Sequence, residues 1–182
     1  MKKIFTLLAL TISFSMNAQW SYNSTSTGIQ SSTNDASGSR AIAMGGYTTA
    51  SGDCTTAMGR FTTASGNRAT AMGGYTTASG IYSTAMGYYT TASDYVSTVI
   101  GQYNSSGSSA TSATSFSTSN TAFVIGNGTA SNAKSDAFKV MFNGDATVSN
   151  DLTVSGDVVV SSDARLKSNI VSLGSTLPKL LQ

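Results

Sequence analysis

The residue types that most often carry enzyme chemistry are scarce in this sequence of 182 residues. It contains no His, and all eight of its acidic residues are Asp, so the commonest general base and the commonest metal ligand are missing. The single cysteine, Cys54, has no second thiol in the chain to form a disulfide, and its variable surroundings indicate an incidental outer-face thiol. We therefore expect no turnover enzyme, no metal site and no bound cofactor.

Regularly spaced rings and hydroxyls point to binding surfaces instead of catalysis. Aromatic residues recur at Tyr47, Phe61, Tyr75, Tyr89 and Tyr103. Such a column is either a stacking surface for glycans or, more simply, a ladder that packs on itself. Thr48 and Thr49 start two hydroxyl columns of the kind that binds ice, but neighbouring strand residues point to opposite faces, so only one column could serve. An ice- or glycan-binding β-solenoid is one alternative.

These side chains are positioned by a 14-residue repeat. The tripeptide Ala-Met-Gly starts at Ala43, Ala57, Ala71 and Ala85, and Val99-Ile-Gly101 continues it in register. Thr-Thr-Ala-Ser recurs with the same spacing from Thr48. An internal repeat of this kind is typical of stacked structural units, and here the array covers residues 31–103.

The composition of each unit predicts β-structure. Gly and Thr are frequent, and both are poor helix formers, whereas the short segments alternate as strands do. Two short strands and two turns per unit would stack at about 4.8 Å into a narrow solenoid, so that each column becomes a ladder. The column of Gly45 and Gly59 is expected to mark a corner. The variable columns that start at Asp53 and Cys54 are expected to face solvent.

One such solenoid has too few large apolar side chains to be stable alone. The unit 59–72 contains only Phe61 and Met72 besides alanines, and their burial does not offset the entropy lost in ordering 14 residues. We therefore predict that the Ala/Met strands pack against the same strands of partner chains, giving a homotrimer with a shared core on a threefold axis.

The N-terminus has the pattern of an export signal. Lys2 and Lys3 precede an apolar run, Ile4 to Phe14, that is too short to span a bilayer. Residues 1–18 are therefore predicted to be a signal peptide, cleaved after Ala18, and the protein to be secreted or on the cell surface, at the outer membrane exterior. No other stretch could span, so no transmembrane anchor is expected in this chain.

The charge of the remaining chain excludes a nucleic-acid partner. Ten basic residues minus Lys2 and Lys3 leave eight, which equal the eight acidic residues. Nucleic-acid binding needs a basic stripe to neutralise phosphates, whereas Arg40, Arg60 and Arg68 are interspersed with aspartates. We expect no nucleic acid among the partners.

The pattern changes after the repeat. Residues 104–120 are a Ser/Thr/Gly-rich insertion without apolar periodicity, predicted to be flexible or loosely wound. Residues 121–160 are predicted to be a β-rich connector, with a strand at 137–142 and turns at Asn127-Gly128 and Asn143-Gly144. Val148, Val154 and Val160 are six residues apart, which suits a fibre-like C-terminal part.

The repeat resembles the head repeat of YadA-like trimeric autotransporter adhesins. The resemblance covers residues 31–101 and is clear in Ala57-Met-Gly-Arg-Phe-Thr-Thr-Ala-Ser-Gly66. It implies an all-β, left-handed parallel β-roll, three chains wide, displayed on a cell surface. The expected function is that of an exported trimeric surface fibre or adhesin-like head with a structural or attachment role, whose ligand is an extracellular protein, a glycan or another surface ligand.

The C-terminal residues 161–182 resemble the opening of the intramolecular chaperone domain of phage endosialidase tailspikes. The resemblance lies in Ser161-Ser-Asp-Ala-Arg-Leu-Lys-Ser-Asn-Ile170. It implies a single self-cleavage between Ser162 and Asp163, with Ser162 as nucleophile and Lys167 as base, and a desolvated lysine can serve such a hydroxyl. Residues 161–182 are too few to bury a core of their own, so they are interpreted as a fragment of that module. A tailspike-like fibre matured by autoproteolysis is therefore a further alternative.

Overall fold

The computed structural model describes residues 21–22, 29–31 and 33–156. The predicted signal peptide and the chaperone-like segment lie outside these ranges. The chain divides into two units, Met1–Asp151 and Leu152–Gln182, and residues 152–156 of the second unit contain no strand. The described residues contain strands and no α-helix, so none of them forms a helix that could cross a membrane.

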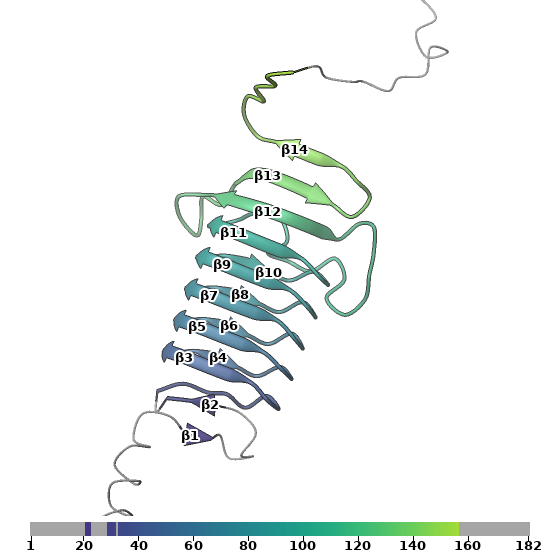
Figure 1. The fold of residues 1–182 in the computed structure, drawn as a ribbon. Helices are drawn as coiled ribbons and strands as arrows, with labels where there is room; N and C mark the ends of the chain where they lie inside the picture. The colour runs from purple at the N-terminus through teal and green to yellow at the C-terminus, as the bar shows by residue number, and fades with distance from the viewer. Residues whose placement is uncertain (1–20, 23–28, 32, 157–182) are drawn as a thin grey trace, which may run out of the picture. The chain divides into compact units, whose positions relative to one another are not determined.

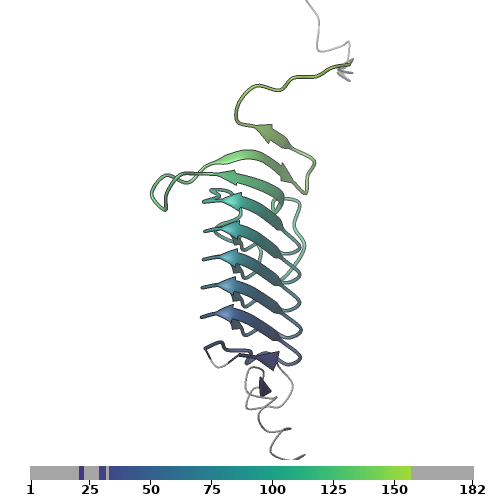
Figure 2. The same ribbon diagram turned by 60° about the vertical axis from the view of Figure 1, so that its left-hand side comes forward.

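The described residues of the first unit form two sheets. The larger has ten strands: β1 (Ser21–Tyr22), β2 (Ile29–Gln30), β3 (Ile42–Gly46), β5 (Thr56–Arg60), β7 (Thr70–Gly74), β9 (Thr84–Tyr88), β11 (Thr98–Gln102), β12 (Thr121–Asn127), β13 (Asp136–Met141) and β14 (Ala146–Val148). The smaller has four strands, β4 (Thr49–Ala50), β6 (Thr63–Ala64), β8 (Thr77–Ala78) and β10 (Thr91–Ala92). Consecutive coils lie one above another along the stack (Figures 1 and 2).

The repeat sets the strand pairing. From β3 to β11 the strands of the large sheet are parallel, and each residue pairs with the residue 14 positions later, as Met44 does with Met58. The short strands pair in the same way, as Thr49 with Thr63 shows. The prediction of an all-β fold with a parallel β-solenoid of 14-residue coils is confirmed.

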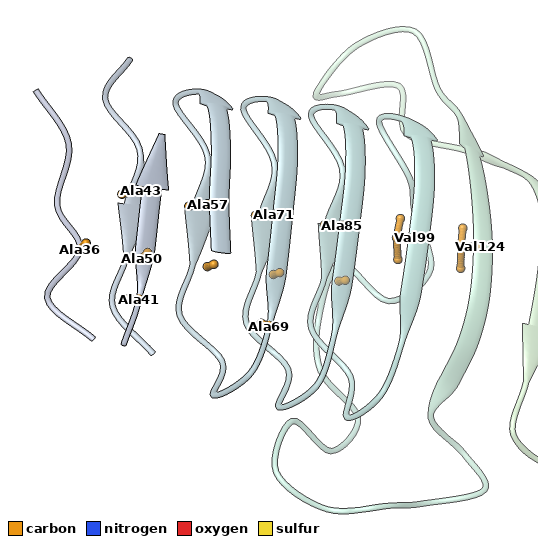
Figure 3. Close-up of a cluster of buried hydrophobic side chains, with 13 residues drawn as sticks. Ala36, Ala41, Ala43, Ala50, Ala57, Ala69, Ala71, Ala85, Val99 and Val124 are labelled. Atoms are coloured by element: carbon orange, nitrogen blue, oxygen red, sulfur yellow. The ribbon is translucent and has the colours of Figure 1, made fainter. Parts of the chain in front are cut away.

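Small side chains fill the interior of the coils. The residues below 2% exposure include Ala43, Ala57, Ala71, Ala85, Val99 and Val124, which form a row along the stack (Figure 3). The short strands contribute a facing row of Ala50, Ala64, Ala78 and Ala92. Sequence reasoning placed Ala and Met in one core, but the structure separates them. Successive strand residues point to opposite faces, so Ala57 points inward and Met58 outward.

The glycine ladder lies inside the strands and not at a corner, so that prediction is wrong. Gly59 is the fourth residue of β5 and has φ +119°, and a Cβ atom there would lie 2.0 Å from the carbonyl oxygen of Gly73. Glycine is thus required by close approach of the coils. The corners are formed by other residues in the left-handed region, such as Tyr47 (φ 57°) and Cys54 (φ 56°).

The insertion 104–120 contains no strand, but hydrogen bonds hold it to the last coil. Asp94 occupies the column of Gly52, Gly66 and Gly80, and it is buried. Its carboxylate accepts hydrogen bonds from the backbone N–H groups of Thr111 at 2.6 Å and Thr121 at 2.8 Å. A carboxylate in this column therefore fastens the middle of the insertion and the start of β12 to the solenoid.

The connector reverses the direction of the chain. β12 continues the parallel stack, and β13 and β14 then add antiparallel strands. The predicted strand at 137–142 is observed as β13, and Gly144, at φ +94°, lies in the predicted Asn143-Gly144 turn. Val148 ends β14, whereas no strand forms around Val154 among the described residues that follow.

Candidate interaction surfaces

The outer face of the large sheet carries an unbroken apolar column, which we call the apolar ladder. Residues that pair directly across strands point to the same side. The pairing therefore aligns Met44, Met58, Met72, Met86, Ile100, Ile125, Phe138 and Val148. Met86 and Val148 are each 38% exposed, and the other members are half-buried. A contiguous apolar surface of this length on one chain marks an interaction face.

A second column widens this face. It runs beside the apolar ladder through Ile42, Thr56, Thr70, Thr84, Thr98, Phe123, Val140 and Ala146. None of these residues carries a charge. The two columns together form a strip with regular spacing, which suits packing against a copy of itself.

The aromatic column forms a stacked ladder, which we call the aromatic ladder. Ring centroids of Tyr47, Phe61, Tyr75, Tyr89 and Tyr103 are 4.5–5.1 Å apart, and neighbouring planes differ by 2–24°. The rings therefore cover each other's faces, and the simpler interpretation of this column fits the structure. A sugar could stack only on a ring at an end of the ladder, such as Tyr47, which is 62% exposed.

The environment of this ladder changes the ionisation of its later members. Burial raises the pKa of Tyr89, and the neighbouring Tyr75 and Tyr88 raise it further. Burial also raises the pKa of Tyr103, where Tyr88 makes the next contribution. Tyr88 meets both rings edge-on. These surroundings thus favour the neutral phenols of Tyr89 and Tyr103.

The two threonine columns have different surroundings. Thr48, Thr62, Thr76 and Thr90 are at most 1% exposed, so this column offers no surface to ice. Their Oγ1 atoms have no hydrogen-bond partner. Thr49, Thr63, Thr77 and Thr91 are half-buried on the outer side of the short strands. Only this second column remains available for an ice-binding surface.

The variable columns face outward in the first coils, as predicted, where Asp53, Cys54, Asn67 and Arg68 are exposed and Cys54 is a free thiol. In the later coils Ile81 and Tyr95 are half-buried, because their backbones hydrogen-bond to the insertion. The Arg68 guanidinium lies 5.2 Å from the centroid of the Tyr82 ring. The described residues contain no cluster of three or more metal-ligating side chains.

The predicted self-cleavage residues Ser162, Asp163 and Lys167 lie outside the described residues. Cleavage between Ser162 and Asp163 therefore stays a prediction. Intact mass measurement of the folded chain tests it, because cleavage would release residues 163–182, and Lys167→Ala would keep the chain whole.

Two features of these surfaces were missed in the sequence. One is the extension of the apolar ladder into Ile125, Phe138 and Val148, which the tripeptide Val124-Ile-Gly126 partly signals by copying the repeat motif. The other is the anchoring role of Asp94. The sequence signal for this role was a carboxylate in a column that glycine occupies in the other coils.

Comparison with known proteins identifies the repeat. Residues 36–59, 50–76 and 78–104 match the family model of the YadA head domain repeat (2 copies). The chain thus carries YadA head repeats, which confirms that part of the predicted resemblance. The match covers the coils and not the segment 161–182, so the resemblance to the endosialidase chaperone is not supported. No curated protein and no solved structure matches the chain.

Proposed function

We propose that this protein is the head of an exported, trimeric surface fibre with a structural or attachment role. The apolar ladder carries the proposal, because it presents a long uncharged strip that one chain leaves partly exposed. The YadA head repeats support the same assignment, since the head domains of this family are trimeric and surface-exposed.

The trimer would place the three apolar ladders around one axis. Inside each coil the core consists of Ala, Thr and Ser with few larger residues, so most large aliphatic side chains of the coils lie on the outer strip. Packing three strips together would add the hydrophobic burial that the narrow coil lacks. The ladder also crosses the connector through Phe138 and Val148, so the shared core would extend beyond the repeats.

Sedimentation of the purified full chain tests the proposal. We expect a mass three times that of the chain. In Met58→Lys/Met72→Lys, two charges on the strip should prevent assembly and leave monomer or unfolded chain, because buried charges without partners are costly. The matched control is Thr63→Lys/Thr77→Lys, which places the same charges on the outer side of the small sheet and should leave the trimer intact. A monomeric wild type, or a trimeric methionine variant, would contradict the proposal.

A further inference from the structure

A polar groove lies where the connector meets the start of the insertion, and the proposed trimer does not use it. It has a volume of 320 Å³ and is lined by Lys134 and Lys139, by Asp136 and Asn127, and by the hydroxyls of Ser135 and Thr147. Lys139 and Thr147 are directly paired on β13 and β14, which places the lysine and the hydroxyl on one face of the sheet.

The acidic group of the groove, the Asp136 carboxylate, is already hydrogen-bonded within the protein. Asp136 Oδ1 accepts a hydrogen bond from the Ser105 N–H and Oδ2 accepts one from the Ser106 N–H, both at 2.8 Å. The Ser135 hydroxyl donates to Asn127 Oδ1 at 2.7 Å. These bonds turn the carboxylate toward backbone donors and fix the wall of the groove.

The two lysines have no such partner. Within the described part of the chain, the side-chain ammonium group of neither Lys134 nor Lys139 makes an ion pair or a hydrogen bond. Lys139 is half-buried on a paired strand, and Lys134 is exposed in the segment between β12 and β13. Two unpaired ammonium groups in one concavity favour an anionic ligand.

The size and lining of the groove indicate what carries that anion. Small-molecule sites start at roughly 300 Å³, so a single inorganic ion would leave most of this groove empty. Hydroxyl and amide groups along the wall suit a ligand rich in hydroxyls. We propose that the groove binds an acidic sugar unit of a polysaccharide, through a carboxylate or sulfate group held by Lys134 and Lys139.

The groove is compatible with the proposed trimer. Lys139 pairs with Val124, whose side chain is buried inside the stack, whereas its neighbour Phe138 belongs to the apolar ladder. The groove and the apolar ladder therefore lie on opposite sides of β13. For its biological meaning this inference rests on the attachment role proposed above, but every residue of the groove comes from one chain.

Binding of the full chain to immobilised heparin and to polygalacturonate tests the inference, with neutral dextran as a blank. We expect salt-sensitive binding to at least one acidic polymer, and at least a tenfold loss of affinity in Lys134→Gln/Lys139→Gln. Retention on heparin but not on polygalacturonate would assign the group as sulfate, and retention on polygalacturonate would assign it as carboxylate. The matched control is Arg40→Gln/Arg68→Gln, which removes two positive charges from exposed corners and should bind like wild type.

Three results would overturn the inference. The first is no binding to either polymer, and the second is equal losses of affinity in the lysine and arginine variants. The third is that free inorganic sulfate displaces the chain as effectively as the free polymer does, when sulfate and sugar units are present at equal concentrations. Circular dichroism spectra and thermal melts establish that the variants are folded. Sedimentation of the same samples separates this inference from the proposed function. A monomer that binds the polymer would disprove the trimer alone, and a trimer that does not bind would disprove the groove alone.

Discussion

At the scale of single residues, the glycine ladder sets how closely the coils approach. A Cβ atom on Gly59 would lie 2.0 Å from the Gly73 oxygen, and this backbone atom is held between two strands. The φ of +119° adds strain for any other residue. We expect Gly59→Ala to destabilise the fold by about 3 kcal/mol or more. Chemical denaturation measures this change in the free energy of unfolding.

Gly46 is the matched control for this substitution. No atom lies within 4 Å of a Cβ atom built there, and its column holds Arg60 and Tyr88 in later coils. Gly46→Ala should change stability by no more than about 0.5 kcal/mol. Equal losses in the two variants would show that the close approach of Gly59 and Gly73 does not limit the packing.

The buried threonines give a second prediction at this scale. Thr62 is fully buried and its Oγ1 has no hydrogen-bond partner, so its hydroxyl has lost water without compensation. Thr62→Val replaces it with a methyl group of similar shape, and we expect stabilisation by about 1 kcal/mol. The shift of the denaturation midpoint at constant slope measures this gain.

Thr55 provides the opposite case. It is 1% exposed, and its Oγ1 donates a hydrogen bond to the Gly52 carbonyl oxygen at 2.7 Å. Thr55→Val leaves that buried carbonyl without this donor, so we expect a loss of about 1 kcal/mol. If both valine variants moved stability in the same direction, the hydrogen bonding of the hydroxyl would not be the deciding factor.

At the scale of elements, the aromatic ladder predicts a loss of stability in alkali. Burial raises the pKa of Tyr89 and Tyr103, so the folded chain holds these protons more tightly than the unfolded chain. Their contribution is fully present below about pH 10, where free tyrosine starts to ionise, and is lost as the pH rises through the raised values. Denaturation midpoints measured between about pH 8 and 12 should fall less steeply in Tyr89→Phe/Tyr103→Phe.

The chain itself offers the precedent for this variant, because Phe61 already occupies one position of the stack without a hydroxyl. Tyr95→Phe, outside the aromatic ladder, controls for the loss of a phenol elsewhere. The same steepness in the ladder variant and in wild type would contradict the prediction.

The repeated elements were predictable because the chain contains several copies of each column. Comparing Ala43 with Ala57 and Asp53 with Asn67 separates fixed from variable positions, and the structure buries the first pair and exposes the second. The structural role of the glycine column could not be determined by comparing copies. A glycine that allows close approach within a strand and one that forms a corner leave the same column in the sequence.

The connector was less predictable because each of its strands occurs once. Phe138 and Val148 continue the apolar ladder only because β13 and β14 return antiparallel in a particular register. That register depends on turns and strand pairing that cannot be inferred by comparing repeated copies, because the connector has none. The polar groove was missed for the same reason, since Lys139 and Thr147 come together through this pairing.

At the scale of the whole molecule, each coil of the solenoid contacts mainly its neighbours, so coils should be removable as units. Deletion of residues 60–73 removes one 14-residue coil and joins Gly59 to Gly74. Met58 then takes Met86 as its partner and Ala57 takes Ala85, so each ladder loses one member and keeps its face. We expect a folded β-protein with lower stability and an unchanged oligomeric state by sedimentation.

Deletion of residues 60–72 tests the register directly, because it removes 13 residues and shifts the following coils by one position. Since side chains alternate between faces, a shift of one would bring inward-facing Ala85 into line with outward-facing Met58, and outward-facing Thr84 into line with inward-facing Ala57. Gly87, the next glycine of the ladder in that variant, would also lose its alignment with Gly59. We expect this shorter deletion to abolish folding, although it removes fewer residues. Comparable stability of the two variants, measured by thermal melting, would show that the core does not depend on the 14-residue register.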